Sequence, residues 1–301
     1  MKSTSTLKIS LWIAIFSMSF LNAQGFIDGF FSEVGALSVT TSYSNSSFSD
    51  FYLGETLTEG VPDHNEIQQD IFDVYAKYEI APDLVTYINI PYIMAKGNGV
   101  PDAVNGQTEV AGIQDVALGI KYRFHRFKYE TSDFSIIGGL TFEVPGNYEQ
   151  NGILSIGSGA FSTDFTAGGH FQSEKGYFLT SFFTYSYRDD VQFNGHFIVP
   201  NAMMGLVKLG YANKYFYADG WLDHTQSLSG VDIDGDDFVQ NGIAQFPATK
   251  VVFTRVGGTL SKKIGRSGFA ASLAGITVLD GRNTGKATTF SVGLTYEVEL
   301  L

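Results

Sequence analysis

The chain has 301 residues, a net charge of −12 and no cysteine. Such an acidic chain is poorly suited to bind nucleic acid, and the lack of cysteine excludes disulfides, thiolate metal sites and cysteine nucleophiles. Aromatic residues make up 15% of the chain and 34 residues are glycine. This mixture favours β-strands joined by bends.

The first 23 residues have the pattern of a signal peptide. Lys2 and Lys8 are basic, residues 9–20 are apolar, and Leu21-Asn22-Ala23 precede Gln24. The apolar run is shorter than the ~20 residues that a spanning helix needs, which disfavours the alternative of an uncleaved anchor. We expect residues 1–23 to be a signal peptide, 24–33 a lead segment and 34–301 an outer-membrane β-barrel.

Twelve segments of the remaining chain alternate apolar and polar residues with a period of two. They are residues 34–43, 67–80, 84–94, 111–124, 134–145, 161–172, 176–188, 201–212, 215–225, 249–262, 268–279 and 287–300. In 111–124, for example, Leu118 and Ile120 share one face while Asp115 and Lys121 share the other. This alternation is typical of β-strands. Pro91, which lacks a backbone N–H, predicts a bulge or an early strand end.

The lengths of these segments and of their connections predict a membrane barrel. Strands in soluble proteins cluster near five or six residues, whereas a tilted membrane strand needs about nine to eleven. The connections are mostly short and long in turn, as in outer-membrane barrels. We therefore expect an all-β fold, a transmembrane antiparallel up-and-down β-barrel of about 12 strands, or ten or fourteen if a pairing segment is hidden. An exported soluble sandwich is the alternative, and it would have to bury many charges on one face.

Aromatic residues on the apolar face gather beside the short connections. They are Tyr78, Tyr122, Phe124, Phe134, Phe171, Tyr177, Tyr211, Phe216, Phe269 and Tyr296. Outer-membrane barrels carry such girdles at the membrane boundary. The pattern supports the barrel and predicts that the short connections face the periplasm.

The sequence G-I-Q-D-V-A-L-G-I-K-Y-R-F resembles the motif of a family of outer-membrane proteins labelled as transporters and named for the meta-cleavage pathway of phenol degradation. The matching positions are Gly112, Asp115, Leu118, Gly119, Lys121 and Tyr122, with support from residues 139–146. The resemblance implies uptake of small hydrophobic or aromatic compounds, and it implies no catalytic residues. The chain departs from the usual barrel ending, because it ends on Leu300-Leu301 instead of an aromatic residue.

The polar face contains aromatic and charged residues that could hold a solute by stacking and hydrogen bonds. The candidate lumen contacts are Tyr75, Lys77, Tyr87, Asp115, Lys121, Arg123, Tyr215, Tyr217, Asp219, Trp221, Asp223 and Arg255. The alternative is a closed lumen in which these residues pair with one another and fill space. Barrels of about eight strands are filled by side chains, and barrels of sixteen or more leave a channel. Twelve strands lie between these sizes, so an open and a closed lumen both remain possible.

An acidic loop contains a weak candidate for a calcium site. Its aspartates are Asp232, Asp234, Asp236 and Asp237, but the spacing lacks the glycine and the glutamate of an EF-hand. A solvated acidic loop is the alternative. A lipid hydrolase is also conceivable for a twelve-stranded barrel, but no serine lies in a nucleophile-like G-x-S-x-G setting.

We expect no enzyme and no cofactor. The predicted function is passive uptake or binding of small hydrophobic or aromatic solutes in the outer membrane. The expected partners are outer-membrane lipid, the barrel assembly machinery and a small-molecule solute, with no nucleic acid. The alternative is a closed surface barrel whose acidic loops bind a partner or divalent cations.

Overall fold

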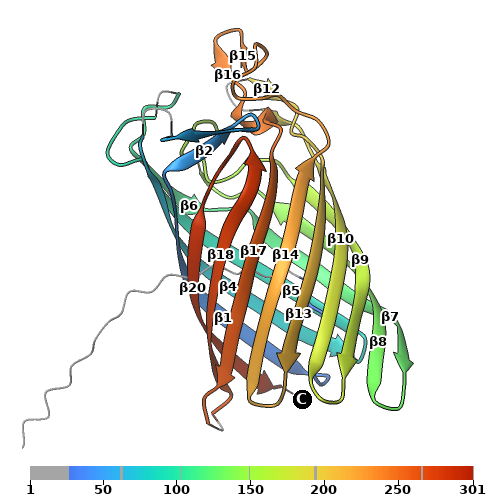
Figure 1. Ribbon diagram of the computed structural model, residues 1–301. Helices are drawn as coiled ribbons and strands as arrows, with labels where there is room; N and C mark the ends of the chain where they lie inside the picture. The colour runs from blue at the N-terminus through green and yellow to red at the C-terminus, as the bar shows by residue number, and fades with distance from the viewer. Residues whose placement is uncertain are drawn as a thin grey trace, which may run out of the picture.

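The computed structural model describes residues 27–61, 64–102, 104–148, 150–192, 195–265 and 267–300. The expected signal peptide lies outside the described residues. Within them, twelve antiparallel strands close into one barrel (Figure 1). The barrel strands are β1 (Ala36–Phe48), β4 (Ile67–Ala81), β5 (Leu84–Lys96), β6 (Glu109–Ile113) continued by β7 (Val116–Lys128), β8 (Ser132–Val144), β9 (Ser162–Ser173), β10 (Tyr177–Arg188), β13 (Ala202–Ala212), β14 (Phe216–Ser227), β17 (Val252–Lys263), β18 (Phe269–Arg282) and β20 (Thr288–Glu299).

The barrel closes between its first and last strands. β1 pairs with β20 from Ala36↔Glu299 to Ser47↔Thr288, and β4 pairs along the other edge of β1. Closure satisfies the backbone groups of every barrel strand, which is the condition for crossing a membrane with strands. The predicted fold class and the strand count of twelve are confirmed. β1 is longer than expected because its pairing with β4 and β20 continues through the polar residues after Tyr43.

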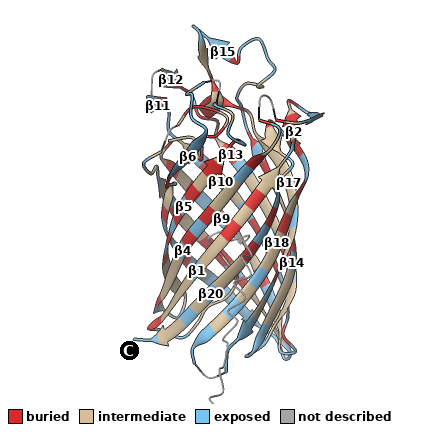
Figure 2. Ribbon diagram, turned by 90° about the vertical axis from the view of Figure 1, so that its left-hand side faces the viewer, coloured by how far each residue is buried: buried red, intermediate tan, exposed pale blue. Residues whose placement is uncertain are grey.

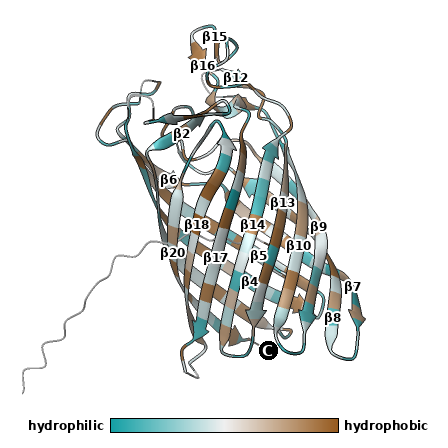
Figure 3. Ribbon diagram, in the orientation of Figure 1, coloured by the Kyte–Doolittle hydropathy of each residue, from teal (hydrophilic) through white to brown (hydrophobic). Residues whose placement is uncertain are grey.

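The alternation places apolar side chains outside and polar or small ones inside. In β7, Leu118 is 53% exposed and Lys121 is 2% exposed. Exposed and buried residues interleave along the barrel wall (Figure 2), as do hydrophobic and hydrophilic ones (Figure 3). At the short-turn end, outward aromatic rings contact one another, with centroid distances of 5.2 Å for Tyr122–Phe124 and 4.7 Å for Phe269–Tyr296. These contacts agree with the predicted girdle.

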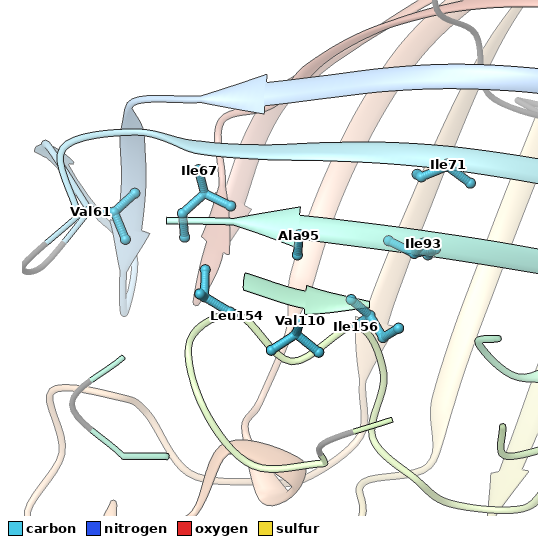
Figure 4. Packing of buried hydrophobic residues seen from close by; sticks show 8 residues of the cluster. All are labelled: Val61, Ile67, Ile71, Ile93, Ala95, Val110, Leu154 and Ile156. Atoms are coloured by element: carbon cyan, nitrogen blue, oxygen red, sulfur yellow. The ribbon is translucent and has the colours of Figure 1, made fainter. Parts of the chain in front are cut away.

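The long connections form a cap over the other end of the barrel, the loop end (Figure 1). It contains β2 (Asp50–Leu53), β3 (Thr56–Glu59), β11 (Val191–Gln192), β12 (His196–Phe197), β15 (Val239–Gln240), β16 (Ile243–Ala244), the 3₁₀ turn η1 (Phe246–Ala248) and β19 (Thr284–Gly285). Buried apolar side chains from strand ends pack there against Leu154 and Ile156 of the 145–161 loop (Figure 4). This packing holds the loop over the barrel mouth. Among the described residues, no helix is long and apolar enough to cross a membrane.

The irregularity expected at Pro91 lies in the neighbouring strand instead. β5 runs through Pro91, whereas the strand beside it breaks between β6 and β7. Asn89 pairs with Ala117 and Tyr92 pairs with Ile113, so the β6–β7 side contains one extra residue. Because Pro91 cannot donate to the ladder, the neighbour loses little by bulging there.

Candidate functional site: the barrel lumen

Residues 27–33, here called the lumen segment, lie inside the barrel toward the short-turn end. Ile27 is buried against Tyr87, Ile137 and Phe182. A Cβ on Gly139 would come within 2.0 Å of the Ile27 side chain, so glycine makes the room that Ile27 occupies. The lead segment expected from the sequence is therefore part of the lumen over its described residues.

Two lysines of the barrel wall bind the lumen segment through Asp28. Lys121 Nζ lies 2.6 Å from Asp28 Oδ1, and Lys77 Nζ lies 3.5 Å from Oδ2. The Phe30 backbone N–H also donates to Asp28 at 2.9 Å. Burial alone would raise the pKa of Asp28, but the Lys121 and Lys77 charges hold it well below its usual range. Asp28 is thus an ionised anchor.

Aromatic contacts fix the next residues of the segment. The Phe30 ring lies edge-on to His170 and Phe178, with centroid distances of 4.7 and 5.1 Å. The Phe31 ring faces Lys121 Nζ and the Arg123 guanidinium, each 4.3 Å from its centroid. These are the dimensions of cation–π contacts.

The lumen segment explains the positions of many predicted contact residues. Tyr75, Lys77, Tyr87, Lys121, Arg123 and Tyr217 all pack around it or bind it. Alternation identified them as inward-facing, but the space they face is occupied by the chain itself.

Of the other predicted contacts near the short-turn end, Asp219 and Trp221 pack against the wall and Tyr215 lies at the rim. Asp219 pairs with Lys208 at 3.1 Å and accepts a hydrogen bond from Tyr217 at 2.6 Å. Trp221 is 3% exposed, and a Cβ on Gly257 would collide with its ring. Tyr215 lies in the turn before β14, is 61% exposed and lines neither of the cavities described below. The structure brings Tyr215 to the rim because β14 begins one residue later.

A cavity of about 580 Å³, the lower cavity, lies above the lumen segment, and Ile27 is part of its lining. Three predicted candidates line it, namely Asp115, Asp223 and Arg255. Arg255 forms a two-pronged ion pair with Asp223, at 3.1 and 2.6 Å. The sequence analysis did not assign a solute role to other lining residues such as Asn89, Glu143 and Asp164.

The 145–161 loop lies over the lower cavity, and the bulge between β6 and β7 holds it there. Tyr148 Oη donates to Asp115 Oδ1 at 2.6 Å and accepts from the Gly159 N–H at 2.9 Å. Gln114 Nε2 donates to the Ile156 carbonyl at 2.6 Å. Asp115, predicted as a solute contact, thus also anchors a loop.

A second cavity of about 520 Å³, the upper cavity, lies among the long loops. Its lining is largely apolar and includes Phe51, Ile153, Val199, Phe238 and Phe246. Ile156 lines both cavities, so this side chain lies at their boundary. A small apolar molecule entering from the loop end would meet the upper cavity first and the polar lower cavity second.

Of the four predicted calcium residues, one forms an ion pair within the protein. Asp232 binds the Arg282 guanidinium at 2.7 and 2.5 Å, and Asn283 Nδ2 donates to it at 2.7 Å. Asp234, Asp236 and Asp237 are exposed. Among the described residues, no three acidic, histidine or cysteine side chains come together in a way that could hold a metal. The structure therefore gives Asp232 an ion pair with the end of β18, and calcium binding at this loop stays a prediction.

The barrel geometry resembles that of known outer membrane channels. A crystal structure of an outer membrane channel from Pseudomonas putida F1 superposes with a TM-score of 0.72 at 13% identity, covering 90% of this chain and 98% of that one. The CymD monoaromatic hydrocarbon channel superposes with a TM-score of 0.41 at 8% identity, covering 89% of each chain. The KdgM porin superposes with a TM-score of 0.44 at 10% identity, covering 86% of this chain and 98% of that one. No curated protein matches in sequence.

The model of the family described as "Putative MetA-pathway of phenol degradation" matches residues 70–195. The resemblance predicted from the motif is confirmed. The matched region contains the motif in β6–β7 and the 145–161 loop that it anchors. With the closed barrel, these findings show a fold shared with an outer membrane channel and a family resemblance over residues 70–195.

Proposed function

We propose that the protein passes small hydrophobic or aromatic solutes across the outer membrane without catalysis. The observation that carries this proposal is the pair of cavities that meet at Ile156, the lower one inside the twelve-stranded barrel and the upper one among the long loops. The apolar upper cavity suits capture of such a solute, because small-molecule sites are concave and largely apolar. The likeness to a channel supports passage in preference to an enzymatic role.

Passage requires movement at the short-turn end, which faces the periplasm in this proposal. The lumen segment fills the barrel below the lower cavity, and its Asp28 is held by two lysines. We propose that release of this segment opens the exit. The exposed apolar wall would contact outer-membrane lipid, and the barrel assembly machinery would insert the chain.

Conductance in planar lipid bilayers tests the proposal. The mature chain and a variant lacking residues 27–33 would be compared, with benzyl alcohol added as an aromatic probe. We expect rare openings of the intact chain, frequent openings of the shortened one, and block by the probe in both. Heat-dependent gel mobility would verify that both barrels are folded.

The same experiment distinguishes passage of solutes from the alternative function, a closed surface barrel. That alternative is favoured by one observation, namely that described segments cover the lumen at both ends. A silent membrane with both folded proteins would support the closed barrel and remove the proposal of passage.

A further inference from the structure

The upper cavity contains one charged side chain, that of Arg188. Among the described residues that line this cavity, all the others are apolar or neutral. Arg188 is the last residue of β10 and is partly buried. Its backbone N–H donates to Asn201 Oδ1 at 2.8 Å, which fixes the chain at this point. A largely apolar cavity therefore has one positive charge at a defined place in its lining.

Arg188 differs from the other described arginines because it has no carboxylate partner. The other four each form an ion pair at 2.5 or 2.6 Å, and they are Arg123, Arg126, Arg255 and Arg282. Within the described part of the chain, the guanidinium of Arg188 makes one long contact, from Nη1 to the Pro200 carbonyl at 3.4 Å. A guanidinium has five N–H donors, and removing it from water is unfavourable unless partners replace the water. The free donors of Arg188 call for an anion.

The nearest acids of the barrel wall do not supply that anion. Glu143, Ser162 and Arg188 are in register across β8, β9 and β10. Ser162 lies between the two charged residues and donates its own hydroxyl to Glu143 Oε2 at 2.9 Å. The charge of Arg188 also acts on Asp164, but Glu143 and Asp164 line the lower cavity, whereas Arg188 lines the upper one. The guanidinium can therefore be reached by a solute in the upper cavity.

We propose that Arg188 binds the carboxylate of a small aromatic acid whose ring lies in the upper cavity. The proposal rests on the function proposed above and adds the chemical class of the solute. A planar guanidinium matches a carboxylate through two parallel hydrogen bonds. Phe238 and Phe246 line the same cavity and would contact the ring, and the volume of about 520 Å³ is in the range of small-molecule sites. The acids of the lower cavity repel an anion, so the solute would be held at Arg188 before any passage.

Calorimetric titration of the purified mature chain in detergent tests this assignment with three probes. Benzoate is ionised at neutral pH, benzyl alcohol is a neutral molecule of similar size, and acetate has the carboxylate without the ring. We expect benzoate to bind at least about tenfold more tightly than benzyl alcohol, because hydrogen bonds between charged groups contribute more than neutral ones. Benzoate should also bind at least about tenfold more tightly than acetate, because the ring buries apolar surface.

Three variants make the test decisive. Arg188→Met keeps the length of the side chain and should remove about tenfold of the benzoate affinity, leaving the benzyl alcohol affinity unchanged. Arg188→Lys keeps the charge but not the planar fork, so its benzoate affinity should lie between those of the intact chain and Arg188→Met. Lys286→Met removes an exposed positive charge elsewhere at the loop end and should change no affinity. Heat-dependent gel mobility would verify that each barrel is folded.

Four results would overturn the carboxylate site. They are equal affinities for benzoate and benzyl alcohol, equal affinities for benzoate and acetate, binding of no probe, and equal effects of Arg188→Met and Lys286→Met. Channel openings in bilayers would still support passage in each of those cases. Conversely, benzoate binding that depends on Arg188 in a protein that stays silent in bilayers would support the site and remove the proposal of passage.

Discussion

Asp28 is the single residue whose loss should open the short-turn end. Its carboxylate is the contact that two wall ammonium groups share, and Lys121 is 2% exposed. The change Asp28→Asn keeps the size of the side chain and its acceptor oxygen for the Phe30 N–H. It removes the negative charge, so Lys121 and Lys77 would then face each other without a counter-ion from the segment.

The expected magnitude follows from the burial of this contact. Removing one partner of a buried ion pair destabilises by about 3–5 kcal/mol. Because the Asp28 side chain is 24% exposed, we take about 2–3 kcal/mol, which is roughly a 30- to 150-fold shift in the ratio of docked to released segment. The barrel itself should stay folded, since its strands pair independently of this residue.

Single-channel recording and thiol labelling would measure this shift. Because the chain has no cysteine, an Ile27→Cys background reports release of the segment through its rate of maleimide labelling. Asp28→Asn should raise both the open probability and the labelling rate, while Glu33→Gln, an exposed acid of the same segment, should change neither. Adding Lys121→Met to Asp28→Asn should restore part of the docking. Unchanged conductance and labelling in Asp28→Asn would refute the anchor.

Three further outcomes are expected at the loop end. Tyr148→Phe removes the hydroxyl between Asp115 and the Gly159 N–H. It should lower the free energy of protection from amide hydrogen exchange in the 145–161 loop by about 2 kcal/mol. Tyr129→Phe, at an exposed tyrosine, should leave this protection unchanged. The hydrogen bonds from Arg282 lower the pKa of Asp232 to about 2, so the stability that this pair contributes is complete above about pH 4 and is lost as the pH falls through about 2; limited acid proteolysis of the loop should show this, and Asp232→Asn should abolish the transition. Since Arg282 occupies Asp232, millimolar calcium should leave the melting temperature unchanged, and a clear rise would revive the metal site.

Alternation was sufficient to predict the strands, because period-two patterning is a local property of each strand, and the lengths of the strands and of their connections predicted the barrel. It also identified which residues face inward, as Lys121 and Trp221 illustrate. It could not predict what fills the space before them. Residues 27–33 have no alternation, so the anchor Asp28 gave no periodic signal.

The motif in β6–β7 contacts both segments that cover the lumen, the 145–161 loop and the lumen segment. At its upper part, Gln114 and Asp115 hold the 145–161 loop over the lower cavity. At its lower part, Lys121 binds Asp28 of the lumen segment. One stretch of wall therefore holds both ends, with the lower cavity between them. Since a solute that crosses the barrel must pass both, changes in this motif should act first on opening and closing.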